Sequence, residues 1–190
     1  MNNIFLTGEK GIGKSTIVNR FVNTLEFLPG GFQTLMFSKD ESGLYTLIIR
    51  PYKLDLAYEK GTEPEGDDFS IVATRENLDQ FMTVNKDAFD FTGVNILRRS
   101  LEKENTRLII MDELGFMEKD ATIFQAEVFK CLDSETPVLG VLKEGSMPFL
   151  DAISEREDVV VIEVTNNNRD QVFTDMAIAR KYAELANCWR

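Results

Sequence analysis

The residues best suited to chemistry lie near the amino end of the chain, in the segment GEKGIGKS at positions 8–15, called the glycine loop below. Gly8, Gly13, Lys14 and Ser15 match the spacing G-x-x-x-x-G-K-[ST]. Glycine allows the positive φ angles with which a loop turns its backbone N–H groups around an anion. The lysine offers a cation to the outer phosphates of a polyphosphate, and the serine offers a hydroxyl to a metal ion.

The flanking segments have the order that such a loop requires. Residues 3–7 form a short apolar run typical of a buried strand, and residues 16–25 place their apolar side chains on one helical face. A helix that begins at the loop also directs its positive dipole end at a bound anion. We therefore predict a nucleotide-binding loop made of Gly8, Glu9, Lys10, Gly11, Ile12, Gly13, Lys14, Ser15 and Thr16.

Two carboxylates end a later apolar run. Asp112 and Glu113 follow residues 108–111, which read as a buried strand. Carboxylates at the end of such a strand are costly to desolvate unless they face water, a metal or donors. We predict that Asp112 and Ser15 hold Mg²⁺, and that Glu113 polarises a water for attack on the γ-phosphorus. Lys14 and Glu113 are then the catalytic residues. The alternative is a strand that simply stops at polar residues.

Other polar residues are weaker candidates. Lys143 and Glu144 close the next predicted strand, where a polar residue could contact the γ-phosphate, but a solvated loop is the favoured interpretation. Arg156 stands among acidic residues and is more typical of a surface ion pair than of a charge-stabilising finger. Asn168 and Arg169 precede the last predicted helix; contact with the nucleobase or ribose and simple helix capping are equally favoured, and both residues are retained as nucleotide-binding candidates.

Composition excludes several kinds of site. The chain has no histidine, so Ser-His-Asp, Cys-His and His-ligated zinc sites are ruled out. Its two cysteines, Cys131 and Cys188, lie far apart and favour free thiols in a reducing compartment. A net charge of −11 repels nucleic acid and anionic membranes, so nucleic acid is an improbable partner. Protein partners are not specified by any pattern in the chain.

Length and hydropathy predict a single domain over residues 1–190. The chain is 43% hydrophobic, enough for one substantial core. Its first residues carry no basic region before an apolar stretch, which disfavours a signal peptide, and no apolar run approaches the roughly 20 residues of a membrane span. We therefore expect a cytoplasmic protein without membrane association.

The remaining elements predict an α/β fold. Apolar runs alternate with amphipathic helical segments, which favours a mostly parallel sheet covered on both faces, with three layers and a ligand site at the carboxyl ends of the strands. Residues 32–38 and 44–49 read as an added antiparallel hairpin, and residues 59–68 as an acidic loop. We further predict strands at 69–74, 138–142 and 159–164, and helices at 87–104, 123–132, after 148 and from about 168.

Several segments together resemble a known family. The segment DELGFME at 112–118 is similar to the D-E-[IL]-G-x-M-E signature of the small nucleoside-triphosphatases of thermophiles, archaea and animals, the cancer-related nucleoside-triphosphatase family. GFQT at 31–34, LDS followed by PVL within 132–139, and T-x-x-N-R-D at 165–170 resemble other family segments in the same order. Segments 35–39 and 81–84 depart from the family pattern.

The resemblance implies a RecA-like P-loop fold and Mg²⁺-dependent hydrolysis of ATP and other nucleoside triphosphates with broad base tolerance. Two other function classes stay open. A P-loop kinase would transfer the γ-phosphoryl group to a small acceptor instead of water. A nucleotide-gated binding module would use the bound nucleotide to shape a surface for a protein partner, for which the acidic segment 59–68 is the candidate.

Overall fold

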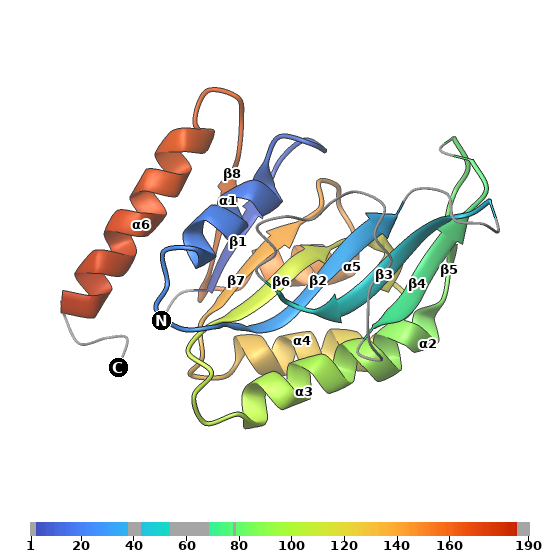
Figure 1. The fold of residues 1–190 in the computed structure, drawn as a ribbon, viewed down its shortest axis with the longest axis horizontal. Helices are drawn as coiled ribbons and strands as arrows, with labels where there is room; N and C mark the ends of the chain where they lie inside the picture. Colours follow the sequence, from blue (N-terminus) through green and yellow to red (C-terminus); the bar gives the residue numbers. More distant parts are fainter. Residues whose placement is uncertain (1–2, 38–42, 54–68, 78, 186–190) are drawn as a thin grey trace.

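The described residues of the computed structural model, 3–37, 43–53, 69–77 and 79–185, build one eight-stranded sheet flanked by helices (Figure 1). The acidic segment 59–68 and Cys188 lie outside these residues. The strands are β1 (Asn3–Thr7), β2 (Gly30–Phe37), β3 (Tyr45–Pro51), β4 (Ser70–Arg75), β5 (Thr83–Val84), β6 (Ile109–Leu114), β7 (Val138–Leu142) and β8 (Val159–Glu163).

The sheet has the order β5-β4-β3-β2-β6-β7-β1-β8. From β2 to β8 the neighbouring strands are parallel, while β2, β3, β4 and β5 pair antiparallel to one another. The predicted mostly parallel sheet with an added antiparallel hairpin is therefore confirmed, and β4 and β5 extend the hairpin. The helical elements are α1 (Lys14–Val22), α2 (Lys86–Ala88), the π-helical turn η1 (Phe89–Gly93), α3 (Val94–Glu102), the 3₁₀ turn η2 (Phe116–Glu118), α4 (Thr122–Leu132), α5 (Pro148–Ser154) and α6 (Arg169–Leu185).

The helices divide between the two faces of the sheet (Figure 1). Alternate residues of a strand point to opposite faces, so Phe5 joins a core with α3, α4 and α5, and the next residue, Leu6, joins a core with α1 and α6. In β6 the same alternation sends Met111 to the first core and Ile110 to the second. Two apolar cores thus make the three predicted layers. None of the helices in the described part of the chain is long and apolar enough to span a membrane.

The predicted helix 87–104 is interrupted, because η1 separates α2 from α3. Gly93 ends η1 where the backbone meets Phe124 of α4: a Cβ at this position would lie 2.7 Å from the Phe124 ring. The buried Asp90 carboxylate accepts hydrogen bonds from the backbone N–H groups of Ile123 (3.1 Å) and Phe124 (3.0 Å) at the start of α4. The irregular turn η1 therefore packs against the start of α4 and fixes its position. The spacing of apolar residues in a helix does not predict this tertiary contact.

The parallel strands bring the chemistry-bearing segments to one edge of the sheet. The glycine loop follows β1, Asp112 and Glu113 lie in the last residues of β6, residue 143 follows β7, and residues 164–168 follow β8. Because these four strands run in the same direction, all four segments lie at the carboxyl edge, where α/β sheets bind ligands.

Candidate active site

The glycine loop is held open by three glycines with positive φ. Gly8, Gly11 and Gly13 have φ values of 124°, 82° and 106°. Gly8 also has no room for a side chain, because a Cβ would lie 2.4 Å from the backbone oxygen of Val164, the residue after β8. Gly8 and Gly13 are the two glycines that the spacing singled out, and Gly11 adds a third left-handed position within the loop.

Lys14, the first residue of α1, reaches back across this loop. Its Nζ donates hydrogen bonds to the backbone oxygens of Gly8 (2.6 Å) and Glu9 (2.9 Å), and its side chain is buried. The ammonium thus stands inside the ring of the loop, where an anion on the loop amides would meet it. Ile12 instead packs into the core with α1 and α6, and Glu9 is exposed.

Ser15 and Asp112 meet although they lie 97 positions apart in the sequence. The Ser15 hydroxyl donates to Asp112 Oδ1 at 2.9 Å. The pKa of Asp112 is raised to about 6, first by burial and also by the nearby Glu113 charge, while the Ser15 hydrogen bond and Lys14 oppose the rise.

This pair fits the predicted metal ion. Two hard oxygen donors converge on one point, and a cation there would offset the cost of the buried Asp112 charge. Within the described residues no cluster of three or more acidic, histidine or cysteine side chains could hold a metal by itself. A Mg²⁺ ion would therefore take its remaining ligands from phosphates and water, which is its usual behaviour at nucleotide sites.

Glu113 is held by residues from both neighbours of β6, namely Thr34 in β2 and Lys143 directly after β7. Its backbone N–H donates to the hydroxyl of Thr34 in β2 (3.3 Å), and that hydroxyl donates to the Asp112 backbone oxygen (3.4 Å). Its carboxylate Oε1 lies 3.2 Å from Nζ of Lys143. Sequence reasoning noted Thr34 as part of a family segment but did not assign it this contact with the carboxylate pair.

Two cavities meet at Glu113. The loop cavity has a volume of about 380 Å³. Of the nine residues 8–16 predicted to bind the nucleotide, all but Glu9 and Ile12 line it, and Glu113, Lys143 and Glu144 complete the lining. The side cavity, about 390 Å³, extends toward β2, β3 and β4 and is lined by Thr34, Arg75, Phe116, Glu118 and others. Glu113, Lys143, Lys10 and Ser15 line both.

Lys143 and Glu144 lie in a partly solvated loop after β7, as the favoured interpretation expected, but Lys143 also faces the site. Its ammonium pairs with Glu113 and lies 4.6 Å from the centroid of the Phe116 ring. The parallel pairing of β6 with β7 brings Lys143 beside the carboxylates, a neighbour that the local sequence does not reveal. Glu144 lines the loop cavity with it.

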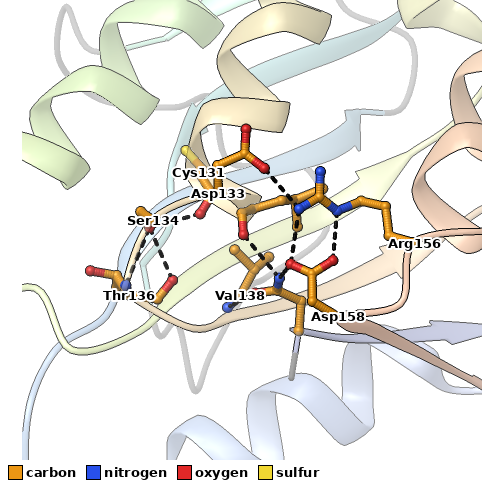
Figure 2. A network of polar contacts seen from close by, with 9 residues as sticks. Cys131, Asp133, Ser134, Thr136, Val138, Arg156 and Asp158 are labelled. Atoms are coloured by element: carbon orange, nitrogen blue, oxygen red, sulfur yellow. Dashed lines mark hydrogen bonds and ion pairs between the residues drawn. The ribbon is translucent and has the colours of Figure 1, made fainter. Parts of the chain in front are cut away.

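Arg156 lies before β8, at the amino ends of the parallel strands, and Figure 2 shows its contacts with Asp133 and Asp158. Its guanidinium bonds Asp158 (2.8 Å) and Asp133 (2.8 Å) just before β8, whose first residue pairs with Asn3 at the start of β1. The glycine loop follows the other end of β1, so the full five-residue length of this strand lies between Arg156 and the loop. The ion pairs agree with the predicted structural interpretation of Arg156.

Asn168 and Arg169 reach the predicted edge but not the cavity lining. The Asn168 side chain accepts from the Thr165 N–H (2.7 Å) and donates to the Glu163 oxygen (2.8 Å), so it fixes the turn between β8 and α6. Arg169 is exposed. The predicted nucleobase contact stays a prediction.

Cys131 is buried in α4, and burial raises the pKa of its thiol to about 12, which agrees with an unreactive thiol.

Glu118 is a buried carboxyl that motif spacing alone did not assign a role. Its Oε2 accepts from the Gly115 N–H (2.9 Å), closing the turn after the carboxylate pair. Burial raises the pKa of Glu118 from 4.5 to about 7; the charge of Glu113 adds to the rise and that of Lys143 opposes it. The group therefore enters the fold most easily as the neutral acid.

This burial predicts a pH-dependent stability difference for Glu118→Gln. Below pH 4.5 Glu118 is neutral in both the folded and unfolded states, so the two proteins differ little. As pH rises to about 7, Glu118 loses its proton in the unfolded wild type but keeps it in the folded wild type. This difference lowers the free energy of unfolding of the wild type by up to about 3 kcal/mol. Metal-free thermal melts should show a variant-minus-wild-type Tm difference that grows from pH 5 to pH 8. A difference that is the same at both pH values contradicts the assignment.

Residues 3–177 match the protein family described as NTPase. The nucleoside-triphosphatase THEP1 of Thermotoga maritima is 30% identical over 179 residues, spanning 94% of this chain and 95% of that protein. The nucleoside-triphosphatase THEP1 of Methanosarcina barkeri is 33% identical over 189 residues, spanning 97% of this chain and 99% of that protein.

Solved structures give the same result for the fold. The crystal structure of THEP1 from the hyperthermophile Aquifex aeolicus has a TM-score of 0.66 at 25% identity, over 93% of this chain and 96% of that one. The solution structure of a human cancer-related nucleoside triphosphatase has a TM-score of 0.67 at 21% identity, over 96% and 99% of the two chains, and shows the fold alone. The predicted three-layer P-loop fold is confirmed. Since the match covers nearly the whole chain and nearly the whole of each relative, this chain belongs to the NTPase family.

Proposed function

We propose that this protein hydrolyses ATP and other nucleoside triphosphates to the diphosphate and inorganic phosphate in a Mg²⁺-dependent reaction. The observation that carries the proposal is the 2.9 Å contact between Asp112 and Ser15, the residue next to the buried Lys14, whose charge acts on Asp112. One hydroxyl from the glycine loop and one carboxylate from β6 thus converge beside a cation. The family relatives carry the name nucleoside-triphosphatase, which supports the same activity.

The residues divide the work among them. The loop amides and Lys14 bind the phosphates, and Ser15 and Asp112 hold the metal ion, which neutralises phosphate charge when it is bound. Glu113 accepts a proton from a water whose oxygen bonds the γ-phosphorus, while the bond from that phosphorus to the β–γ bridging oxygen breaks. The Thr34 hydroxyl positions the backbone of Asp112 and Glu113. Catalysis then comes from positioning and electrostatics.

Phosphate release from ATP, GTP, CTP and UTP tests the proposal. We expect release from all four with Mg²⁺, because the contacts described above are all with the phosphate end. EDTA should lower the rate at least about tenfold, because the positive charge that neutralises the triphosphate comes from the metal ion and not from Asp112 or Ser15 themselves. Added Mg²⁺ should restore it. Undiminished release in EDTA contradicts the metal assignment.

A kinase is the second candidate, and the side cavity favours it. This cavity of about 390 Å³ continues past Glu113, where a small acceptor could lie with a hydroxyl near the carboxylate. The same phosphate assay separates the two functions. A hydrolase releases inorganic phosphate from NTP and water alone, whereas a kinase releases little phosphate at any time and forms NDP and a phosphorylated product once an acceptor is added. The proposal also places the protein in the cytoplasm, where nucleoside triphosphates are abundant and the Cys131 thiol stays reduced.

A further inference from the structure

Lys143 stands between the glycine loop and the carboxylate pair. It follows β7, which lies between β1 and β6 in the sheet. Its stem passes over Gly115, where a Cβ would lie 3.0 Å from Lys143 Cδ, and its ammonium lies near the Phe116 ring. These contacts keep the ammonium at the boundary of the two cavities, both of which it lines.

The ammonium can meet two anions at this boundary. One is Glu113, whose Oε1 lies 3.2 Å away. The other is whatever anion enters the loop cavity next to Lys14. Among the described residues three cations line that cavity, and the other two are differently placed: Lys14 already bonds two loop carbonyls, and Lys10 is exposed. Lys143 is therefore the cation that faces the proposed base.

A γ-phosphate is the stronger of these two anions. It carries up to two negative charges and three oxygens, compared with one charge on a carboxylate, so it competes well for a single ammonium. Lysine suits such an exchange, because its charge sits at the end of a flexible stem. Loss of the ion pair also leaves the Glu113 carboxylate with free lone pairs for a water proton.

We propose that Lys143 exchanges partners when a nucleoside triphosphate binds: its ammonium leaves the Glu113 carboxylate and pairs with the γ-phosphate. The exchange frees Glu113 to act as the base and supplies, from within the chain, the positive charge that an arginine finger supplies elsewhere. During hydrolysis the water proton goes to Glu113, and Lys143 takes no part in the proton transfer. This inference rests on the proposed function and adds a catalytic residue to it.

Nucleotide binding tests the exchange without turnover. Calorimetric titration with Mg²⁺ and either ADP or a non-hydrolysable ATP analogue would compare the wild type with Lys143→Met, Glu113→Gln and the double variant. Lys143→Met should weaken analogue binding about tenfold and change ADP binding less than twofold, because ADP lacks the γ-phosphate. Glu113→Gln should tighten analogue binding several-fold by releasing the ammonium. Lys119→Met, an exposed lysine outside both cavities, is the matched control.

The double variant is decisive. If Glu113 competes for Lys143, the gain from Glu113→Gln disappears in the Lys143→Met background. An equal gain in both backgrounds means that Glu113 merely repels phosphate, which overturns the exchange. The exchange is also overturned if Lys143→Met binds the analogue as tightly as the wild type does and binds ADP as tightly as the wild type does. Lys143→Arg should restore the preference for the analogue, which excludes a folding defect as the cause. Phosphate release by the unaltered protein reports the proposed function separately, so either idea can fail alone.

Discussion

Glu113→Gln is expected to lower the rate of phosphate release about 10²- to 10⁴-fold at saturating nucleotide, the range typical for loss of a general base. Glutamine keeps the size of the side chain and its backbone bond to Thr34, but its amide cannot take a proton from water. Because Lys14, Ser15 and Asp112 are unchanged, the KM for the nucleotide should stay the same or fall. The loss therefore belongs to kcat.

Steady-state phosphate release with Mg²⁺-ATP measures this effect, and thermal melts show whether the variant is folded. Asp120→Asn is the matched control, because this exposed carboxylate in the turn before α4 lines neither cavity and should leave the rate unchanged. If Glu113→Gln hydrolyses ATP at the wild-type rate, Glu113 is not the base and another group must orient the water.

Gly31→Ala is expected to destabilise the fold by at least about 4 kcal/mol, beyond the range of ordinary substitutions. Gly31 has φ +95°, and a Cβ there would lie 1.9 Å from the backbone oxygen of Ile110 in β6, which is a forbidden contact. The strand β2 would have to move away from β6. Thr34, three residues later, would then lose its hold on the carboxylate pair.

Thermal melts compare this variant with Gly145→Ala. Gly145 also has a positive φ, +129°, but no atom lies within 4 Å of a Cβ built there. It should lose only the cost of a left-handed backbone, about 1 to 2 kcal/mol. The Gly31 variant should lose at least about 8 °C in Tm or fail to fold, and the control less than that. Equal losses would mean that the close approach of the two strands is unimportant.

Much of the site was predictable because its signals are local. The glycine loop depends on backbone angles that glycine alone adopts easily, and the strand before it and helix after it follow from the period of their apolar residues. The same logic located β6 and its two carboxylates, because an apolar run that ends in charges predicts the end of a buried strand. The resemblance to a family came from such short segments and was confirmed by the match over residues 3–177.

The strand order was beyond local reasoning. The separation in sequence between the glycine loop and Asp112 left room for intervening strands, and the strand that lies between β1 and β6 is β7, which comes later in the chain. Strand pairing depends on how all the apolar faces are buried together, so it is a property of the whole sheet. The contact between Lys143 and Glu113 follows from that pairing and not from the sequence around either residue.

By itself, then, the sequence determined which residues have the chemistry for a triphosphate and a metal ion, because side-chain type and backbone freedom are properties of single residues. Only the tertiary structure decided which charges meet. It buried Glu118, paired Lys143 with Glu113, and confined Arg156 to ion pairs at the amino ends of the parallel strands. The partner of a charged side chain cannot be predicted from the residues around it, because that partner is set by contacts between strands distant in sequence.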